Sequence, residues 1–138
     1  MQLTEVRSIE VAEEKILCLS LDYASSGKSL IVSLSSGFLA HVPLDDNEEI
    51  QTFSAHMYEP WITTFDKSDD SEMTAWSGGD DLVLKKWDLE QTFRPSLVNK
   101  QYVTPPGEHA ELARFEAGVT TIAFSPHIPY LMAVGRYV

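Results

Sequence analysis

The sequence has little cysteine, little basic charge and no long hydrophobic run. Its single cysteine, Cys18, cannot form an internal disulfide, and its place in the apolar run 16–19 predicts a reduced, packed thiol. Ten basic residues stand against 21 acidic ones, and the net charge of -11 repels phosphate backbones and anionic lipids. No apolar run approaches the roughly 18 residues of a membrane span, and the N-terminus carries acids where a signal peptide needs bases. These absences argue against nucleic acid and membranes as partners and predict a cytoplasmic protein.

The chain does have enough apolar residues for one core, since 43% of its 138 residues are hydrophobic. The apolar runs are short and alternate with polar residues, which is the pattern of half-buried strands. The clearest runs are 18–21, 29–34, 61–65 and 119–124. Clusters of serine, glycine and aspartate between them predict turns. The chain is therefore predicted to be all-β.

The strand pattern repeats. Phe65 ends an alternating run 44 residues after Leu21 does, and Ser77 follows Ser33 at the same interval. Phe124 ends a third copy 59 residues after Phe65 if residues 94–110 are an insertion. A repeat of about 40–45 residues with four strands is the signature of a propeller blade.

The repeat predicts blade-like units at residues 16–50, 53–93 and 112–138. About two and a half blades cannot close a ring, because propellers need about four to eight. We therefore expect an incomplete propeller and a fragment of a longer protein. Unpaired strand edges and apolar faces of such a fragment favour association.

Residues 77–90, SGGDDLVLKKWDLE, resemble the closing hairpin of a WD40 blade. Blades of that family carry a hydrogen-bonded set of histidine, serine or threonine, aspartate and tryptophan, and the matching positions are His56, Ser77, Asp81 and Trp87. Asp81 is expected to accept from the His56 ring, whose other nitrogen accepts from Ser77, which accepts from the Trp87 indole. This resemblance implies a structural role for the four residues.

A more specific resemblance covers residues 53–137. The segments AHMYEPWITTF (55–65), WSGGDD (76–81), AGVTTI (117–122), SPH (125–127) and LMAVGRY (131–137) are similar to those of the diphthine methyl ester hydrolases, WD-repeat enzymes of the diphthamide pathway. Pro60 and Arg136 depart from that pattern. The resemblance implies an esterase that removes a methyl group from methylated diphthine on translation elongation factor 2. No cofactor and no metal are expected.

Ester hydrolysis needs a base and a group that stabilises the oxyanion. The sequence lacks a G-x-S-x-G elbow, and its four histidines, at 41, 56, 109 and 127, lack metal-ligand spacing. The catalytic candidates are His127 and Asp80, although each also fits an ordinary turn residue. Glu59 lies at a strand entrance beside Trp61, which is predicted to be in the core.

A second function is compatible with the sequence. WD40 folds are usually platforms for other proteins, so a non-catalytic interaction scaffold is the alternative. The acidic pairs at 45–46 and 69–70 fit solvated turns, and they also fit a surface that steers a basic partner.

Overall fold

The computed structural model describes residues 3–90, 96–98, 101–103 and 110–138. The strands are β1 (Cys18–Tyr23), β2 (Ser29–Leu34), β3 (Phe38–Pro43), β4 (Gln51–Ser54), β5 (Ile62–Phe65), β6 (Thr74–Gly78), β7 (Val83–Asp88), β8 (Ser96–Val98), β9 (Gln101–Val103), β10 (Ala110–Arg114), β11 (Val119–Phe124) and β12 (Met132–Arg136). The all-β prediction is confirmed, and β2 and β11 coincide with the alternating runs 29–34 and 119–124. No helix in this part of the chain is long and apolar enough to cross a membrane.

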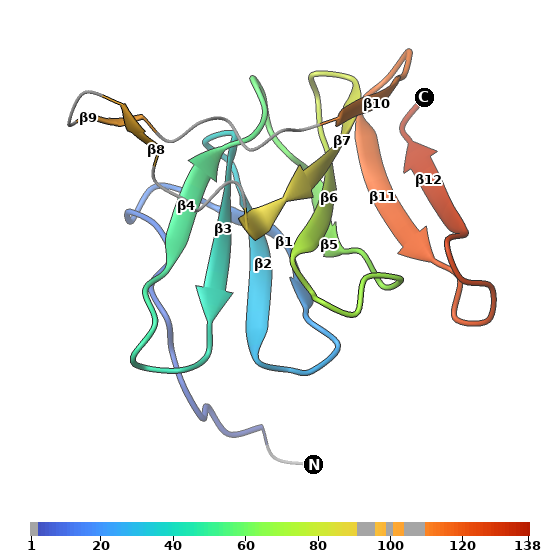
Figure 1. The fold of residues 1–138 in the computed structure, drawn as a ribbon. Coiled ribbons are helices and arrows are strands. Elements are labelled where there is room, and N and C mark those ends of the chain that lie inside the picture. The colour runs from blue at the N-terminus through green and yellow to red at the C-terminus, as the bar shows by residue number, and fades with distance from the viewer. Residues whose placement is uncertain (1–2, 91–95, 99–100, 104–109) are drawn as a thin grey trace.

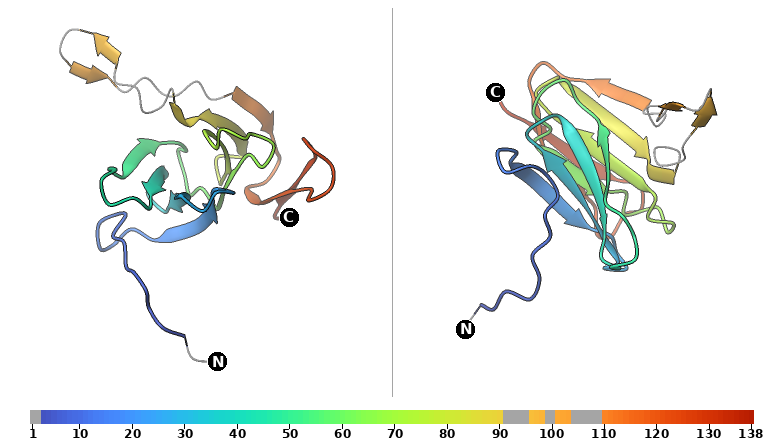
Figure 2. Two further views of the ribbon diagram at one scale, coloured as in Figure 1. Left: turned by 60° about the horizontal axis from the view of Figure 1, so that its bottom comes forward. Right: turned by 90° about the vertical axis from the view of Figure 1, so that its left-hand side faces the viewer.

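The strands form antiparallel sheets of neighbouring chain segments. The first sheet has the order β1-β2-β3-β4, the second has the order β10-β7-β6-β5, and β11 pairs with β12 (Figure 1). These sheets stand side by side, while the β8–β9 hairpin projects away from them (Figure 2). Two four-stranded meanders followed by the start of a third are the arrangement of consecutive blades in an incomplete propeller.

The sheets have different bounds from the predicted sequence units. β4 lies beyond residue 50 yet pairs with β3, and β10 begins at the last residue of the predicted insertion yet pairs with β7. Each four-stranded sheet thus takes its outermost strand from the segment that leads into the next sheet. The repeat units 16–50, 53–93 and 112–138 stay a prediction about the sequence.

Three apolar layers hold the sheets together. The first lies between the two four-stranded sheets and contains Ile31, Leu39, Phe53, Phe65 and Trp87. The second covers the other face of the first sheet, where the segment 9–16 packs against valines of β2 and β3. The third joins the second sheet to β11 and β12 through Trp76, Leu84, Val119 and Ile122. Apolar side chains therefore fill most of the space between neighbouring sheets, and Asp22 of β1 accepts hydrogen bonds from Thr64 Oγ1 and Phe65 N of β5.

Cys18 is exposed, so the prediction of a packed thiol is wrong. β1 is an edge strand, and its pairing with β2 shifts between Cys18 and Ser20. Ile16 packs against the first sheet, but Leu17 and Cys18 face outward. The run 16–19 is therefore split between the core and the surface, because the irregular pairing breaks its alternation.

Residues 44 positions apart, such as Ser33 and Ser77, do not occupy equivalent positions in the first and second sheets. Ser33 pairs with Leu39 and Gly78 pairs with Leu84, so Ser33 corresponds to Gly78 and not to Ser77. By the same register, Val32 takes the place of Ser77. The polar set of the second sheet is thus replaced in the first by apolar packing of Val32 against the segment 9–16. The Ser33 hydroxyl is left buried without a hydrogen-bond partner.

Candidate functional site

The hydrogen-bonded set begins in the loop before β5. The His56 ring is fully buried, and its Nδ1 lies 2.8 Å from both carboxylate oxygens of Asp81, in the turn between β6 and β7. Its Nε2 lies 2.6 Å from Ser77 Oγ, and the Trp87 indole donates to the same oxygen over 2.8 Å. Because an indole N–H only donates, the Ser77 proton points to Nε2 and the His56 proton sits on Nδ1. The geometry ties β6, β7, the turn between them and the loop before β5 together.

Charge also favours the ionised form of Asp81. Burial acts to raise the pKa of Asp81, but the hydrogen bond from His56, the electrostatic interaction with its ring and the charge of Lys85 outweigh it and lower the pKa. The Lys85 ammonium is 3.8 Å from the carboxylate and donates to Ala55 O over 2.6 Å. Every polar group of this set is satisfied within the protein, which is typical of a structural element.

Asp80, one of the two catalytic candidates, lies next to this set but does not belong to it. Its backbone N–H donates to Glu59 O over 3.0 Å, and its side chain lies against Gly118 and Tyr137. The carboxylate atom Oδ1 is buried and has no hydrogen-bond partner. An unpartnered buried carboxylate oxygen is expensive, so it marks Asp80 as the unusual acid of this turn.

Trp61 is 39% exposed, so the prediction that it belongs to the core is wrong. It precedes the first residue of β5, and the strand is fully buried only from Thr63 to Phe65, so Trp61 lies outside the buried stretch. Glu59, two residues earlier, is half-buried. Both residues lie at the end of the second sheet that carries Asp80, because Asp80 N bonds to Glu59 O.

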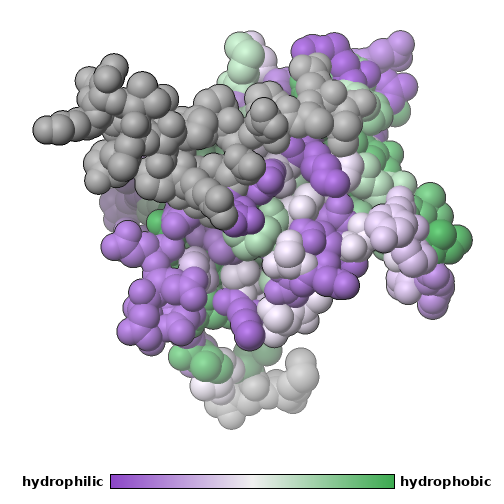
Figure 3. All heavy atoms as spheres, in the orientation of Figure 1, coloured by the Kyte–Doolittle hydropathy of each residue, from purple (hydrophilic) through white to green (hydrophobic). Residues whose placement is uncertain are grey.

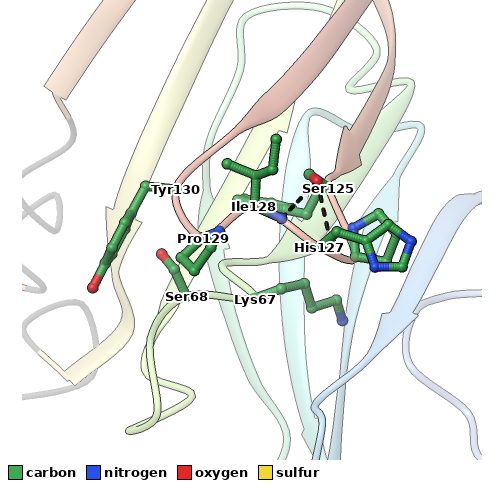
Figure 4. A pocket seen from close by; sticks show the side chains of 9 residues that line it. Lys67, Ser68, Ser125, His127, Ile128, Pro129 and Tyr130 are labelled. Atoms are coloured by element: carbon green, nitrogen blue, oxygen red, sulfur yellow. Dashed lines mark hydrogen bonds between the residues drawn. The ribbon is translucent and has the colours of Figure 1, made fainter.

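His127, the other candidate, lines a cavity of about 180 Å³ under the β11–β12 turn. Figure 4 shows Lys67 and Ser68, from the loop after β5, on one side of the cavity and the turn on the other. Ser125 Oγ accepts the backbone N–H groups of His127 and Ile128 over 3.3 and 3.0 Å. Serine, not histidine, therefore caps the turn, and the imidazole is exposed.

The cation in this cavity is already engaged. Lys67 Nζ donates to Asp22 Oδ2 over 2.7 Å and to Tyr23 O over 2.8 Å, which ties the second sheet to β1. No acidic side chain is among the residues that line the cavity. Tyr130 stands at its margin, 83% exposed and with a φ of 65°, a strained backbone value for a bulky residue. The site therefore offers an imidazole, hydroxyls and an aromatic ring.

Sequence reasoning missed a buried carboxylate beside this cavity. Asp66 accepts from the Trp76 indole over 3.0 Å and from the Ser68 hydroxyl over 2.5 Å, with Lys86 3.6 Å away. Burial acts to raise the pKa of Asp66, but bonds from Ser68 and Trp76 and the Lys86 charge outweigh it, so the pKa is lowered. The sequence carries no signal for this pairing, because Trp76 lies ten residues away across a turn.

The structure does not bring the two catalytic candidates together. Val119 N, at the start of β11, bonds to Gly79 O beside Asp80, whereas His127 lies in the turn after Phe124, the last residue of β11. A six-residue strand separates the two positions by about 17 Å. Asp80 and His127 therefore cannot act on one ester bond.

The remaining polar candidates serve local structure. Asp45 accepts from Asn47, Asp46 pairs with Arg7 at 2.6 Å, and Asp69 accepts from Ser71. His41 packs edge-on against Phe65 in the first apolar layer, and His109 lies outside the described residues. The described part of the chain holds no group of three or more metal-ligating side chains.

The sequence of the chain is similar to those of several diphthine methyltransferases. The chain is 39% identical to a diphthine methyltransferase homolog of Dictyostelium discoideum over 126 residues, which cover 88% of this chain and 33% of the relative. It is 36% identical to the diphthine methyltransferase of Schizosaccharomyces pombe over 63% of the chain, and 30% identical to that of Mus musculus over 91%, in each case covering 26% of the relative. The chain is a homologue of the diphthine methyltransferases. It spans about a quarter to a third of their length.

Other comparisons add little to this relationship. No model of a known protein family matches the chain. A chain in the crystal structure of a mitotic checkpoint complex matches 91% of this chain with a TM-score of 0.44 and 16% identity, over 46% of its own length. A likeness of this strength bears on neither activity nor partners, so the relationship to the diphthine methyltransferases rests on sequence.

Proposed function

We propose that this chain is part of a carboxylic ester hydrolase that removes the methyl ester from methylated diphthine on translation elongation factor 2. The observation that carries the proposal is the homology to the diphthine methyltransferases over most of the chain. The segments shared with the diphthine methyl ester hydrolases lie around His56, Asp80, Gly118 and His127. Both catalytic candidates therefore fall within them.

Hydrolysis is preferred to methyl transfer as the reaction to test, although the relatives are named for transfer. In hydrolysis a water oxygen bonds to the ester carbon, the bond from that carbon to the methoxy oxygen breaks, and methanol leaves with the proton that the base took from water. In methyl transfer the methyl group comes from a donor and no methanol forms. The two reactions are therefore separated by one product.

The alternative is a non-catalytic WD40 scaffold. One observation favours it: the described residues bring no acid, base and oxyanion stabiliser together, because Asp80 and His127 lie at opposite ends of β11. A scaffold needs only exposed surface, and WD40 folds often serve that purpose. The same observation fits an esterase whose site is completed by the rest of a longer protein.

The experiment uses the full-length protein and methylated elongation factor 2, with no methyl donor added. We expect the modified peptide to lose the mass of one methylene while methanol is released in equal amount. A substrate that keeps its mass, or that loses it equally fast when the protein is absent, contradicts the hydrolase proposal and favours the scaffold. Methyl gain that requires a donor supports transfer instead.

Point variants identify the residue that supplies the base. Loss of a general base lowers turnover by about 10²-fold or more. Asp80→Asn and His127→Ala each remove one candidate, and circular dichroism checks that the fold is retained. Since the two residues lie about 17 Å apart, we expect one variant to lose turnover and the other to keep it. Full turnover in both rules out both candidates.

A further inference from the structure

Exposed aromatic side chains lie at the end of the second sheet that carries Asp80. Trp61 is 39% exposed, Tyr58 is 57% exposed and Tyr137 is 49% exposed. A single exposed aromatic side chain is ordinary, but several around one acidic turn call for an explanation. Backbone hydrogen bonds join the segments that carry them to the β6–β7 turn, since Asp80 N donates to Glu59 O, Val119 N donates to Gly79 O and Tyr137 N donates to Gly118 O.

Two glycines let these segments approach one another. A Cβ on Gly79 would lie 2.4 Å from Glu59 O and 2.9 Å from Pro60 Cα, so no side chain fits between this turn and the segment that carries Tyr58 and Trp61. A Cβ on Gly118 would lie 2.4 Å from Asp80 Oδ1 and 2.5 Å from Tyr137 Cε1. The Asp80 carboxylate and the Tyr137 ring are therefore immediate neighbours.

The negative charge of Asp80 is not compensated by hydrogen bonds at Oδ1, which is buried and has no partner. The nearby cations are engaged elsewhere, since Lys85 bonds to Ala55 O and Arg136 pairs with Glu116 at 3.3 Å. A carboxylate oxygen that has no hydrogen-bond partner and lies beside an aromatic ring adds to the negative potential around that ring. This end of the sheet is thus suited to a cation.

The hydrogen-bond acceptors, ring faces and charge of this surface determine which kind of cation it can bind. A primary ammonium donates three hydrogen bonds and needs acceptors for them, whereas a quaternary ammonium donates none and binds to ring faces and formal negative charge. We infer that the aromatic surface formed by Tyr58, Trp61, Asp80 and Tyr137 binds a trimethylammonium group. The inference rests on the proposed function, because diphthine carries a trimethylammonium group on the carbon next to its carboxyl carbon.

The inferred trimethylammonium site indicates at which end of the sheets the ester binds. The permanent charge lies one carbon away from the ester, so both groups must be bound at the same end. The cavity at His127 has no carboxylate in its lining that could pair with a cation. The aromatic surface therefore places the ester near Asp80.

The first test measures binding to the full-length protein by ligand-detected NMR. The probe is trimethylglycine methyl ester, which carries a trimethylammonium group and a methyl ester on one carbon. The control is methyl 3,3-dimethylbutanoate, in which a carbon replaces the charged nitrogen at nearly the same shape. We expect the charged probe to bind at least about tenfold more tightly. Equal affinities, or no binding of the charged probe, overturn the inference.

Variants then locate the binding. Asp80→Asn and Tyr137→Leu are each expected to weaken probe binding about tenfold, while Tyr137→Phe keeps the ring and retains binding. Matched controls at the other end are Asp70→Asn, which removes an exposed turn acid, and Tyr130→Leu, which removes an exposed ring. Binding that survives Asp80→Asn and Tyr137→Leu overturns the inference, as does loss in both controls.

The outcomes also separate this inference from the proposed function. A full-length protein that binds the probe through the aromatic surface but releases no methanol from elongation factor 2 retains the inference and loses the hydrolase. A protein that releases methanol at an unchanged KM in Tyr137→Leu retains the hydrolase and loses the inference, because Tyr137 is not a candidate for the base. Thermal unfolding of each variant checks that a lost signal does not come from a lost fold.

Discussion

The substitution Asp81→Ala tests whether the hydrogen-bonded set holds the second sheet together. The His56 ring is fully buried, so removal of the carboxylate leaves its Nδ1–H without an acceptor and without water. An orphaned buried donor costs about 1–3 kcal/mol. Val83 N and Met57 N also lose the carboxylate, but at 3.3 and 3.4 Å these bonds are long and add little.

Asp80→Ala is the matched control, one residue away in the same turn. Its Oδ1 has no hydrogen-bond partner, so its removal takes away no bond to that atom and relieves a desolvated charge. We expect the stability of this variant to stay within about 0.5 kcal/mol of the wild type. The contrast between neighbouring aspartates removes any effect of the turn itself.

The measurement is the denaturant midpoint of each variant in the full-length protein, at an unchanged slope. His56→Leu removes the buried donor, so the effect of Asp81→Ala should shrink in that background. Equal losses from Asp80→Ala and Asp81→Ala would refute the assigned roles. An undiminished Asp81→Ala loss in the His56→Leu background would refute the hydrogen bond as its cause.

Four further outcomes are expected. The pKa of Asp66 is lowered in the folded state, so its ionised carboxylate stabilises the fold above about pH 4. This stabilisation is lost as the pH falls through the folded-state pKa, so Asp66→Asn should flatten the acid unfolding curve. Burial lowers the pKa of His41 and outweighs the opposite effect of the Glu48 charge, so the unfolded state binds more protons than the folded state just below about pH 6.5. The stability should therefore rise with pH up to about 6.5, and His41→Gln should remove this rise. Gly79→Ala drives a methyl group into backbone atoms and should cost about 1–3 kcal/mol in urea unfolding. Met57→Ala removes an 82% exposed side chain, and its melting temperature should match the wild type.

The strands were predictable because their side chains alternate between two environments. β5 lies within the alternating run 61–65, and β7 lies within the segment 77–90 that resembles a closing hairpin, with turns where serine, glycine and aspartate cluster. Alternation has a period of two, so it locates a strand but says little about its partner or its register. The misplaced Ser33 follows from this, since a shift of one residue exchanges the two faces of β2.

The site was predictable only in part. The structure brings His56, Ser77, Asp81 and Trp87 within hydrogen-bond distance, as the WD40 resemblance implies. The exposure of Trp61 depends on how segments distant in sequence meet at the end of a sheet. The contact of Asp80 with Tyr137 has the same origin, because it crosses from the second sheet to β12. No local pattern of residues encodes such meetings.

The pairing of β10 with β7 has a consequence for synthesis of the chain on the ribosome. β6 and β7 are joined by a tight turn, but β10 begins more than 20 residues after β7 ends, and closing a loop about five times longer costs about 1.4 kcal/mol more. Until Arg114 has left the ribosome tunnel, the pairing of β7 residues Val83 to Lys86 with β10 stays incomplete. At about 5–20 residues per second, that interval lasts on the order of seconds. Two lysines on the waiting strand give it charge, which discourages pairing with other nascent chains during that time.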